Sequence, residues 1–155
     1  LVGDGILRPE LEARLETMGL ADAFVFAGLV SPAEIPRYTA LMDLLVHLSL
    51  REGLPRTVVQ ALATGIPAVA FRLDGTPEVV LEGRTGHLCP PEDVAAVSRA
   101  VTDLLRNPGR CAEMGRNGRE LVKSRFDWRR MFDTIEDEYR TALPAGIRRS
   151  RNRAS

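Results

Sequence analysis

Glu52 is the residue of this sequence with the clearest capacity for chemistry. It lies in the run SLREGLPRTVVQALATG, which spans residues 49–65, in a short loop beside Gly53. A carboxylate in such a loop can accept hydrogen bonds from the hydroxyl groups of a sugar or a ribose. An acidic side chain near a helix start can equally serve only to stabilise the helix dipole. Residue type and position leave both roles open.

The elements around Glu52 decide which ligand it could reach. We expect a buried strand at 43–48, the loop, a helix at 56–64 that Gly65 ends, and a second strand at 66–71. This order places the loop and the first turn of the helix at the carboxyl edge of a parallel sheet, where open α/β folds bind ligands. A helix N-terminus also favours anions such as phosphate. The pattern predicts a site for an anionic, hydroxylated ligand.

Other polar residues near this loop have two possible roles each. Arg51 and Arg56 flank the acid and suit phosphate oxygens, or they are solvated side chains. Gly3 and Gly5 frame a turn that either lines a nucleotide cleft, because glycine allows close backbone approach, or is a plain turn. His47 lies inside an apolar strand, where we expect a hydrogen-bonded core residue and not a catalyst.

Strands and helices alternate along the rest of the chain. We expect a strand end at residues 1–2, a helix at 7–18 closed by Gly19, a strand at 24–26 and a helix to about residue 41 that begins with the capping pattern of Ser31 and Glu34. Further elements are expected at 76–81, 86–89, 91–105, 110–123 and 128–143. The alternation predicts an α/β fold, a Rossmann-like parallel sheet with helices on both faces. The apolar stripe of the last helix, which includes Trp128, is most simply core, and partial exposure is the alternative if the stripe packs on a further domain.

Composition limits the classes of function. The 155 residues are 45% apolar and 27% charged, which suits a globular domain. Lys plus Arg and Asp plus Glu each total 21, but four arginines lie in the last eight residues, so the remainder has 17 basic and 21 acidic residues. This mildly acidic part argues against a broad nucleic-acid surface. No metal is implied, because there is no His/Cys cluster and no D-x-D pair. Cys89 and Cys111 are expected to be free thiols, with one disulfide left open.

Six segments, in order, resemble the C-terminal, nucleotide-sugar-binding domain of glycosyltransferase family 4, which has the GT-B architecture. They are VGDG at 2–5, F-x-G at 26–28, SLREGLP at 49–55, QALATGIPAVA at 60–70, DGTPEVV at 74–80 and GRTGHLCPPED at 83–93. Each segment alone is weak evidence for the resemblance, but the six together are strong evidence, because they occur in the right order and cover nearly the whole chain. The family carries an acidic pair, E-x7-E, across this loop and helix. Glu52 matches the first acid, whereas Gln60 stands at the second position.

The resemblance implies roles for these residues. Glu52 would be the acid of the catalytic site and would bond hydroxyl groups of the donor sugar. Gln60 would hold the ribose more weakly than a carboxylate, because a hydrogen bond to a charged group contributes about 1.5–3 kcal/mol and a neutral one about 0.5–1.5 kcal/mol. An ordinary polar helix residue is the alternative for Gln60. The other expected donor contacts are Gly3, Gly5, Gly28, Leu29, Arg51, Gly53, Leu54, Pro55, Arg56 and Thr57.

The resemblance also implies an activity. It is retaining, metal-independent transfer of a hexose or similar sugar from a UDP- or GDP-linked donor to an acceptor hydroxyl, with no cofactor. The acceptor would bind mostly to an N-terminal domain upstream of Leu1, so this chain alone is expected to be inactive. Two other functions stay open: a non-catalytic module that binds a nucleotide sugar or a partner, and a nucleotide-sugar epimerase of the GT-B type.

Domain organisation follows from the same pattern. Residues 1–143 are expected to form one nucleotide-sugar-binding domain whose first βα units are missing, and residues 144–155 a flexible basic tail. A cytoplasmic location is expected, without a nucleic-acid partner. Peripheral membrane association of the full-length protein is a further expectation.

Overall fold

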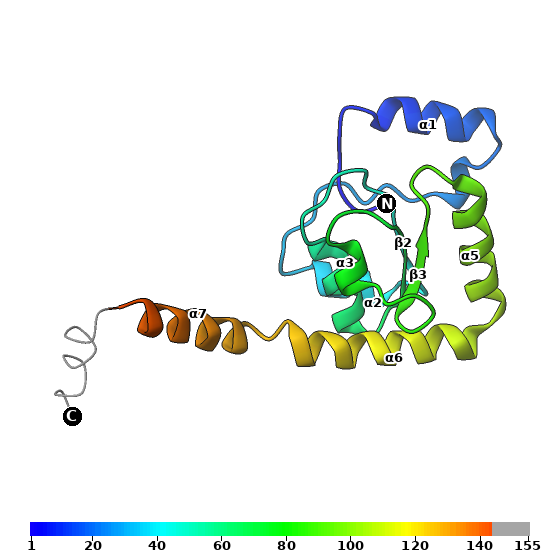
Figure 1. The fold of residues 1–155 in the computed structure, drawn as a ribbon. Helices are drawn as coiled ribbons and strands as arrows, with labels where there is room; N and C mark the ends of the chain where they lie inside the picture. Colours follow the sequence, from blue (N-terminus) through cyan, green and yellow to red (C-terminus); the bar gives the residue numbers. More distant parts are fainter. Residues whose placement is uncertain (144–155) are drawn as a thin grey trace. The chain divides into compact units, whose positions relative to one another are not determined.

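A computed structural model describes residues 1–143 (Figure 1). They divide into two compact units, Leu1–Met42 and the chain from Asp43 onward. The basic tail expected at 144–155 lies outside the described residues.

The first unit contains two α-helices and one short 3₁₀ helix. They are α1 at Arg8–Thr17, η1 at Ala21–Ala23 and α2 at Ile35–Ala40. Gly19 follows α1 in the left-handed conformation, with φ of +67°, and its N–H donates to the carbonyl of Glu16. Such a glycine is a common helix terminator, so the predicted end of this helix is confirmed.

Two expectations for the first unit are wrong. Residues 24–26 form no strand: the N–H of Gly3 bonds the carbonyl of Gly28 in an isolated antiparallel bridge, and Val25 is 76% exposed. A strand needs a ladder of bridges at successive positions, and the single bridge at Gly28 does not extend over residues 24–26. The hydroxyl of Ser31 does donate to the carboxylate of Glu34, at 2.8 Å, but regular helix begins only at Ile35. Pro36 explains the late start, because it has no N–H to continue the helix backward.

The second unit is built on a parallel three-stranded sheet. Its strands are β1 at Leu45–His47, β2 at Ala68–Phe71 and β3 at Gly86–Cys89, in the order β1-β2-β3. Leu45 lies opposite Ala68, which in turn lies opposite Gly86. The helices are α3 at Arg56–Thr64, α4 at Thr76–Val79, α5 at Val94–Arg106, α6 at Pro108–Arg125 and α7 at Trp128–Ala142.

The central strand β2 buries side chains on both of its faces. Ala68 and Ala70 pack in one cluster with Val58 and Leu62 of α3. Alternate residues, with Val69 among them, pack in a second cluster that contains residues of α5 and α6. Figure 1 shows α3 and α5 on opposite sides of β2 and β3. The predicted parallel sheet with helices on both faces is therefore confirmed, since side chains alternate along a strand.

The strands that flank the predicted site are shorter than expected. The strand expected at 43–48 covers only Leu45–His47, and Val46 is 43% exposed. β1 is an outer strand of the three-stranded sheet, so it has a single neighbouring strand among the described residues. The strand expected at 66–71 begins at Ala68, because Pro67 cannot donate a hydrogen bond to a ladder.

The helix that follows the Glu52 loop is firmly placed. α3 spans the predicted residues and ends at Gly65, whose φ is +85°. Gly115 of α6 comes so close that an added Cβ would lie 1.9 Å from the carbonyl oxygen of Gly65. Close packing between α3 and α6 therefore fixes the helix that carries Thr57 and Gln60.

The last helix is exposed and does not contribute to the core of the described residues. α7 contains no buried residue, so its apolar stripe is not core within the described part of the chain. Its exposed members are Trp128, Met131, Phe132, Ile135 and Tyr139. No helix among residues 1–143 has the length and apolar character needed to cross a bilayer.

Candidate functional site

The loop that carries Glu52 leaves the carboxyl end of β1 and is tied down along its backbone. The hydroxyl of Ser49 donates to the carbonyl of Arg51 at 3.0 Å. The N–H of Glu52 donates to the Oδ2 atom of Asp74 at 3.0 Å. Asp74 belongs to the turn that follows β2, so neighbouring strands contribute the two anchors. The backbone of Glu52 is therefore held in place without a ligand.

The turn at Asp74 and Gly75 supports the same loop. Asp74 has φ of +45°, a left-handed conformation that aspartate adopts more readily than most residues. Gly75 donates its N–H to the carbonyl of Gly53 at 3.0 Å. A Cβ at Gly75 would lie 2.3 Å from that oxygen, so the contact requires glycine. Two adjacent loops at one edge of the sheet thus form a single support beneath Glu52.

The Glu52 side chain lies beside His47. Its Oε1 atom is 3.2 Å from Nε2 of His47, and the Glu52 side chain is 29% exposed. Nδ1 of the same imidazole is 3.2 Å from the hydroxyl of Thr57 in α3. Nε2 is buried and makes no aligned hydrogen bond within the described residues. The expectation of a fully hydrogen-bonded core histidine is therefore wrong. Nε2 makes no aligned hydrogen bond, and the ring lies beside a carboxylate and not in an apolar core.

The N-terminus of α3 opens next to this carboxylate. Pro55 precedes the helix as its N-cap, and no side chain caps the first turn. Arg56, Thr57 and Gln60 lie on the exposed face of the helix, whereas Val58 is buried. The helix dipole places partial positive charge at this end. Arg51, Gly53 and Leu54 are also exposed.

This arrangement can bind two kinds of group side by side. The carboxylate of Glu52 accepts hydrogen bonds from hydroxyl groups. The first turn of α3, with Arg51 and Arg56 nearby in sequence, can bind an anion such as a phosphate. The structure brings the predicted residues 51–57 and Gln60 together on the loop and on one helix.

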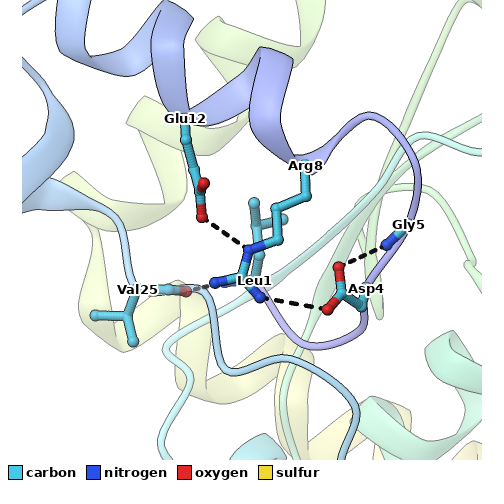
Figure 2. Close-up of polar contacts among 6 residues, drawn as sticks. All are labelled: Leu1, Asp4, Gly5, Arg8, Glu12 and Val25. Atoms are coloured by element: carbon cyan, nitrogen blue, oxygen red, sulfur yellow. Dashed lines mark hydrogen bonds and ion pairs between the residues drawn. The ribbon is translucent and has the colours of Figure 1, made fainter.

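The remaining predicted donor contacts lie in the first unit. Gly3 and Gly28 are joined by their 2.8 Å backbone hydrogen bond, while Gly5 and Leu29 are exposed. Figure 2 shows how this segment is held: Arg8 contacts Asp4 and Glu12, at 3.3 and 2.7 Å, and the N–H of Gly5 bonds Asp4. A further backbone contact runs from the amino group of Leu1 to the carbonyl of Val25 (Figure 2). The guanidinium of Arg8 also lies 5.3 Å from the ring centroid of Phe26.

Three residues that shape these groups were missed from the sequence. From the sequence, Arg8 is one polar residue of an expected helix, His47 is expected in the core, and Asp74 is only part of the segment DGTPEVV. An Asp-Gly pair after a strand signals a turn, so the pair at residues 74–75 could have been placed at the edge of the sheet from the sequence. No sequence signal links His47 to Glu52, because their contact depends on how the loop closes.

The family is shown by comparison with known proteins. A family model described as glycosyl transferases group 1 matches residues 1–121. The chain belongs to this family. This group 1 chain is 35% identical over 136 residues to GDP-mannose-dependent alpha-(1-6)-phosphatidylinositol monomannoside mannosyltransferase of Mycolicibacterium smegmatis, covering 83% of the chain and 36% of that enzyme. It is 30% identical over 151 residues to D-inositol 3-phosphate glycosyltransferase of Streptomyces avermitilis, covering 97% of the chain and 32% of that enzyme.

A solved structure supports the same conclusion for the fold. HepE from Anabaena, crystallised in complex with UDP, matches with a TM-score of 0.85 and 27% identity, over 92% of this chain and 40% of that one. The same protein was also solved with UDP-glucose. The group 1 chain spans about a third of the length of the curated relatives it matches. The α/β fold of the GT-B type is thus confirmed.

Proposed function

We propose that the full-length protein is a retaining, metal-independent glycosyltransferase of family 4, and that this chain is its donor-binding domain. Membership of the group 1 family supports glycosyl transfer. The retaining outcome, the independence from metal and the family 4 assignment rest on the resemblance of the sequence motifs. Glu52 at the sheet edge, beside the open first turn of α3, is the observation that carries the proposal.

The donor is a nucleoside diphosphate sugar, linked to UDP or GDP. Support comes from relatives of both kinds: HepE was solved with UDP and with UDP-glucose, and the mycobacterial relative is named as GDP-mannose-dependent. Glu52 binds hydroxyl groups of the sugar, and Gln60 binds the ribose. Gly3, Gly5, Gly28 and Leu29 are assigned to the nucleotide by the same resemblance.

The reaction exchanges one carbon–oxygen bond for another. The bond between the anomeric carbon and the β-phosphate oxygen breaks, and the anomeric carbon bonds to the acceptor oxygen, whose proton is released to water. The departing diphosphate gains negative charge. Preorganised positive groups stabilise such charge, and the first turn of α3 with Arg51 and Arg56 provides them. Pro55 contributes no N–H to this interaction.

The acceptor and the cellular setting are part of the proposal as well. The acceptor binds mainly outside this chain, which alone therefore does not turn over. The transferred group is a hexose or a similar sugar. The full-length enzyme acts in the cytoplasm and can associate with a membrane surface.

A donor screen on the full-length protein tests the proposal. UDP-glucose, UDP-N-acetylglucosamine and GDP-mannose are each offered with a panel of hydroxyl acceptors, and sugar transfer is followed by mass spectrometry. We expect transfer from one nucleotide class and a loss of about 10- to 100-fold for Glu52→Ala, the range for a hydrogen bond to a charged group. Glu113→Ala, an exposed change on α6, is the matched control and should be unaffected. Equal transfer by Glu52→Ala and the wild type would overturn the role of Glu52.

A further inference from the structure

The carboxylate of Glu52 is contacted at one oxygen only. Among the described residues, its side chain pairs with His47 alone, through Oε1 at 3.2 Å. The second oxygen, Oε2, pairs with no side chain among the described residues, and the side chain as a whole is 29% exposed. One oxygen therefore faces the protein while the other can face a bound hydroxyl group.

His47 is fixed on its opposite side. Its backbone lies in β1, opposite Ala70 of β2, and its side chain is only 15% exposed. Nδ1 is 3.2 Å from the hydroxyl of Thr57, in the first turn of α3. The imidazole thus lies between an outer strand and the helix, in contact with the loop that joins them.

The chemistry of the three groups sets the direction of their hydrogen bonds. An ionised carboxylate only accepts, so a hydrogen bond between the two groups requires a proton on Nε2. In the neutral imidazole Nδ1 is then an acceptor, and the hydroxyl of Thr57 donates to it. Nε2 is buried without an aligned partner, and a buried donor that stays unpaired is destabilising. Rotation of the Glu52 carboxylate into line with Nε2 would pair this donor.

We propose that His47, oriented by Thr57, is a positioning residue for Glu52. It binds Oε1 and thereby directs Oε2 toward the hydroxyl groups of the donor sugar. The role rests on the proposed function, because it matters only if Glu52 binds the sugar. His47 itself touches no substrate. Its substitution should therefore affect the sugar part of the donor and leave the nucleotide part unchanged.

The test measures binding of the full-length protein to UDP, UDP-glucose, GDP and GDP-mannose by calorimetry. The wild type is expected to bind either UDP and UDP-glucose or GDP and GDP-mannose. For that nucleotide sugar, His47→Leu should weaken binding about 3- to 10-fold, the range for one neutral hydrogen bond. Affinity for the free nucleotide should not change. His47→Gln keeps an N–H donor near the Nε2 position and should restore part of the loss.

The double variant separates positioning from an independent effect. If His47 acts through Glu52, His47→Leu should add nothing in the Glu52→Ala background, because contacting residues that share one function are not additive. A further loss in that background, or equal weakening of nucleotide and nucleotide sugar, would overturn the positioning role. Should His47→Leu fail to fold, judged by circular dichroism, the same comparison with His47→Gln, alone and in the Glu52→Ala background, decides the question. Unchanged sugar binding by Glu52→Ala, or no binding of any of the four ligands by the wild type, would refute the proposed function instead.

Discussion

Gly75 donates its N–H to the carbonyl oxygen of Gly53 at 3.0 Å, and a methyl group on Gly75 would lie 2.3 Å from that same oxygen. The loop after β1 therefore rests directly on the turn after β2. Asp74, the preceding residue, accepts the N–H of Glu52. The position of the acid thus depends on a turn more than twenty residues away in sequence.

Gly75→Ala should disturb this support. The φ of Gly75 is −77°, which alanine adopts freely, so the effect would be steric and not conformational. Overpacking of this kind costs about 1–3 kcal/mol. We expect denaturant unfolding to show that loss of stability, together with weaker binding of the nucleotide sugar. Gly109→Ala, where an added Cβ would meet only Asn107 at 3.9 Å, is the control and should be close to neutral. Equal stability of the two variants would contradict this prediction, because it would mean that the Gly53 loop moves away from the added methyl group without loss of stability.

Gln60→Glu should strengthen nucleotide binding. The residue is exposed on α3, so a carboxylate there requires no burial. Exchange of a neutral for a charged acceptor adds about 1 kcal/mol to a hydrogen bond, which is roughly a fivefold gain in affinity. Calorimetry with UDP or GDP measures it. The matching 2′-deoxynucleotide should show a much smaller gain, and an equal gain for both nucleotides would exclude ribose as the partner of residue 60.

The two thiols should react slowly in the native protein. Cys89 and Cys111 are both free and buried, which confirms the expectation of free thiols. Burial raises the pKa of the Cys89 thiol, as do the nearby charges of Glu82 and Asp93. Burial also raises the pKa of the Cys111 thiol, with a further contribution from Asp43. Because the thiolate is the reactive form, iodoacetamide should label both only after denaturation. Rapid native labelling of either would contradict this burial.

Glu82 should make stability depend on pH. Burial alone would raise its pKa, but the N–H of Leu88 and the side chains of His87 and Arg72 outweigh it and hold the pKa below its usual value of 4.5. A lowered pKa means that the contribution to stability is complete above the usual value and is lost as the pH falls through the folded pKa. The Tm deficit of Glu82→Gln should therefore be present at neutral pH and shrink as the pH falls below 4.5. Glu113→Gln serves as the control, and a deficit of constant size across pH would contradict the assignment.

The sequence predicted the elements around the site because their ends are marked by local chemistry. Gly65 and Gly19 stop their helices through left-handed backbone, and the burial of β2 on both faces follows from an apolar run between two helices. The position of Glu52 between β1 and α3 could be predicted for the same reason. The strand at 24–26 could not be judged locally, because three apolar residues form a strand only where a partner strand pairs with them.

The interactions that orient the side chains of the site could not be predicted from the sequence. The contact of His47 with Glu52 and the bond from Glu52 to Asp74 join residues whose distance depends on loop closure. The sequence could not decide between core and an exposed face for the Trp128 stripe, because helical spacing reports which residues share a face and not what covers that face. The residues that position Glu52 therefore required coordinates.

A crystal structure of the full-length protein with a bound nucleotide sugar tests the central claim most directly. The distance to be measured joins the carboxylate oxygens of Glu52 to the hydroxyl oxygens of the sugar. We predict at least one such distance of about 2.5–3.0 Å, the range for a hydrogen bond from a hydroxyl to an oxygen acceptor. A donor bound with its sugar remote from Glu52 would contradict the account.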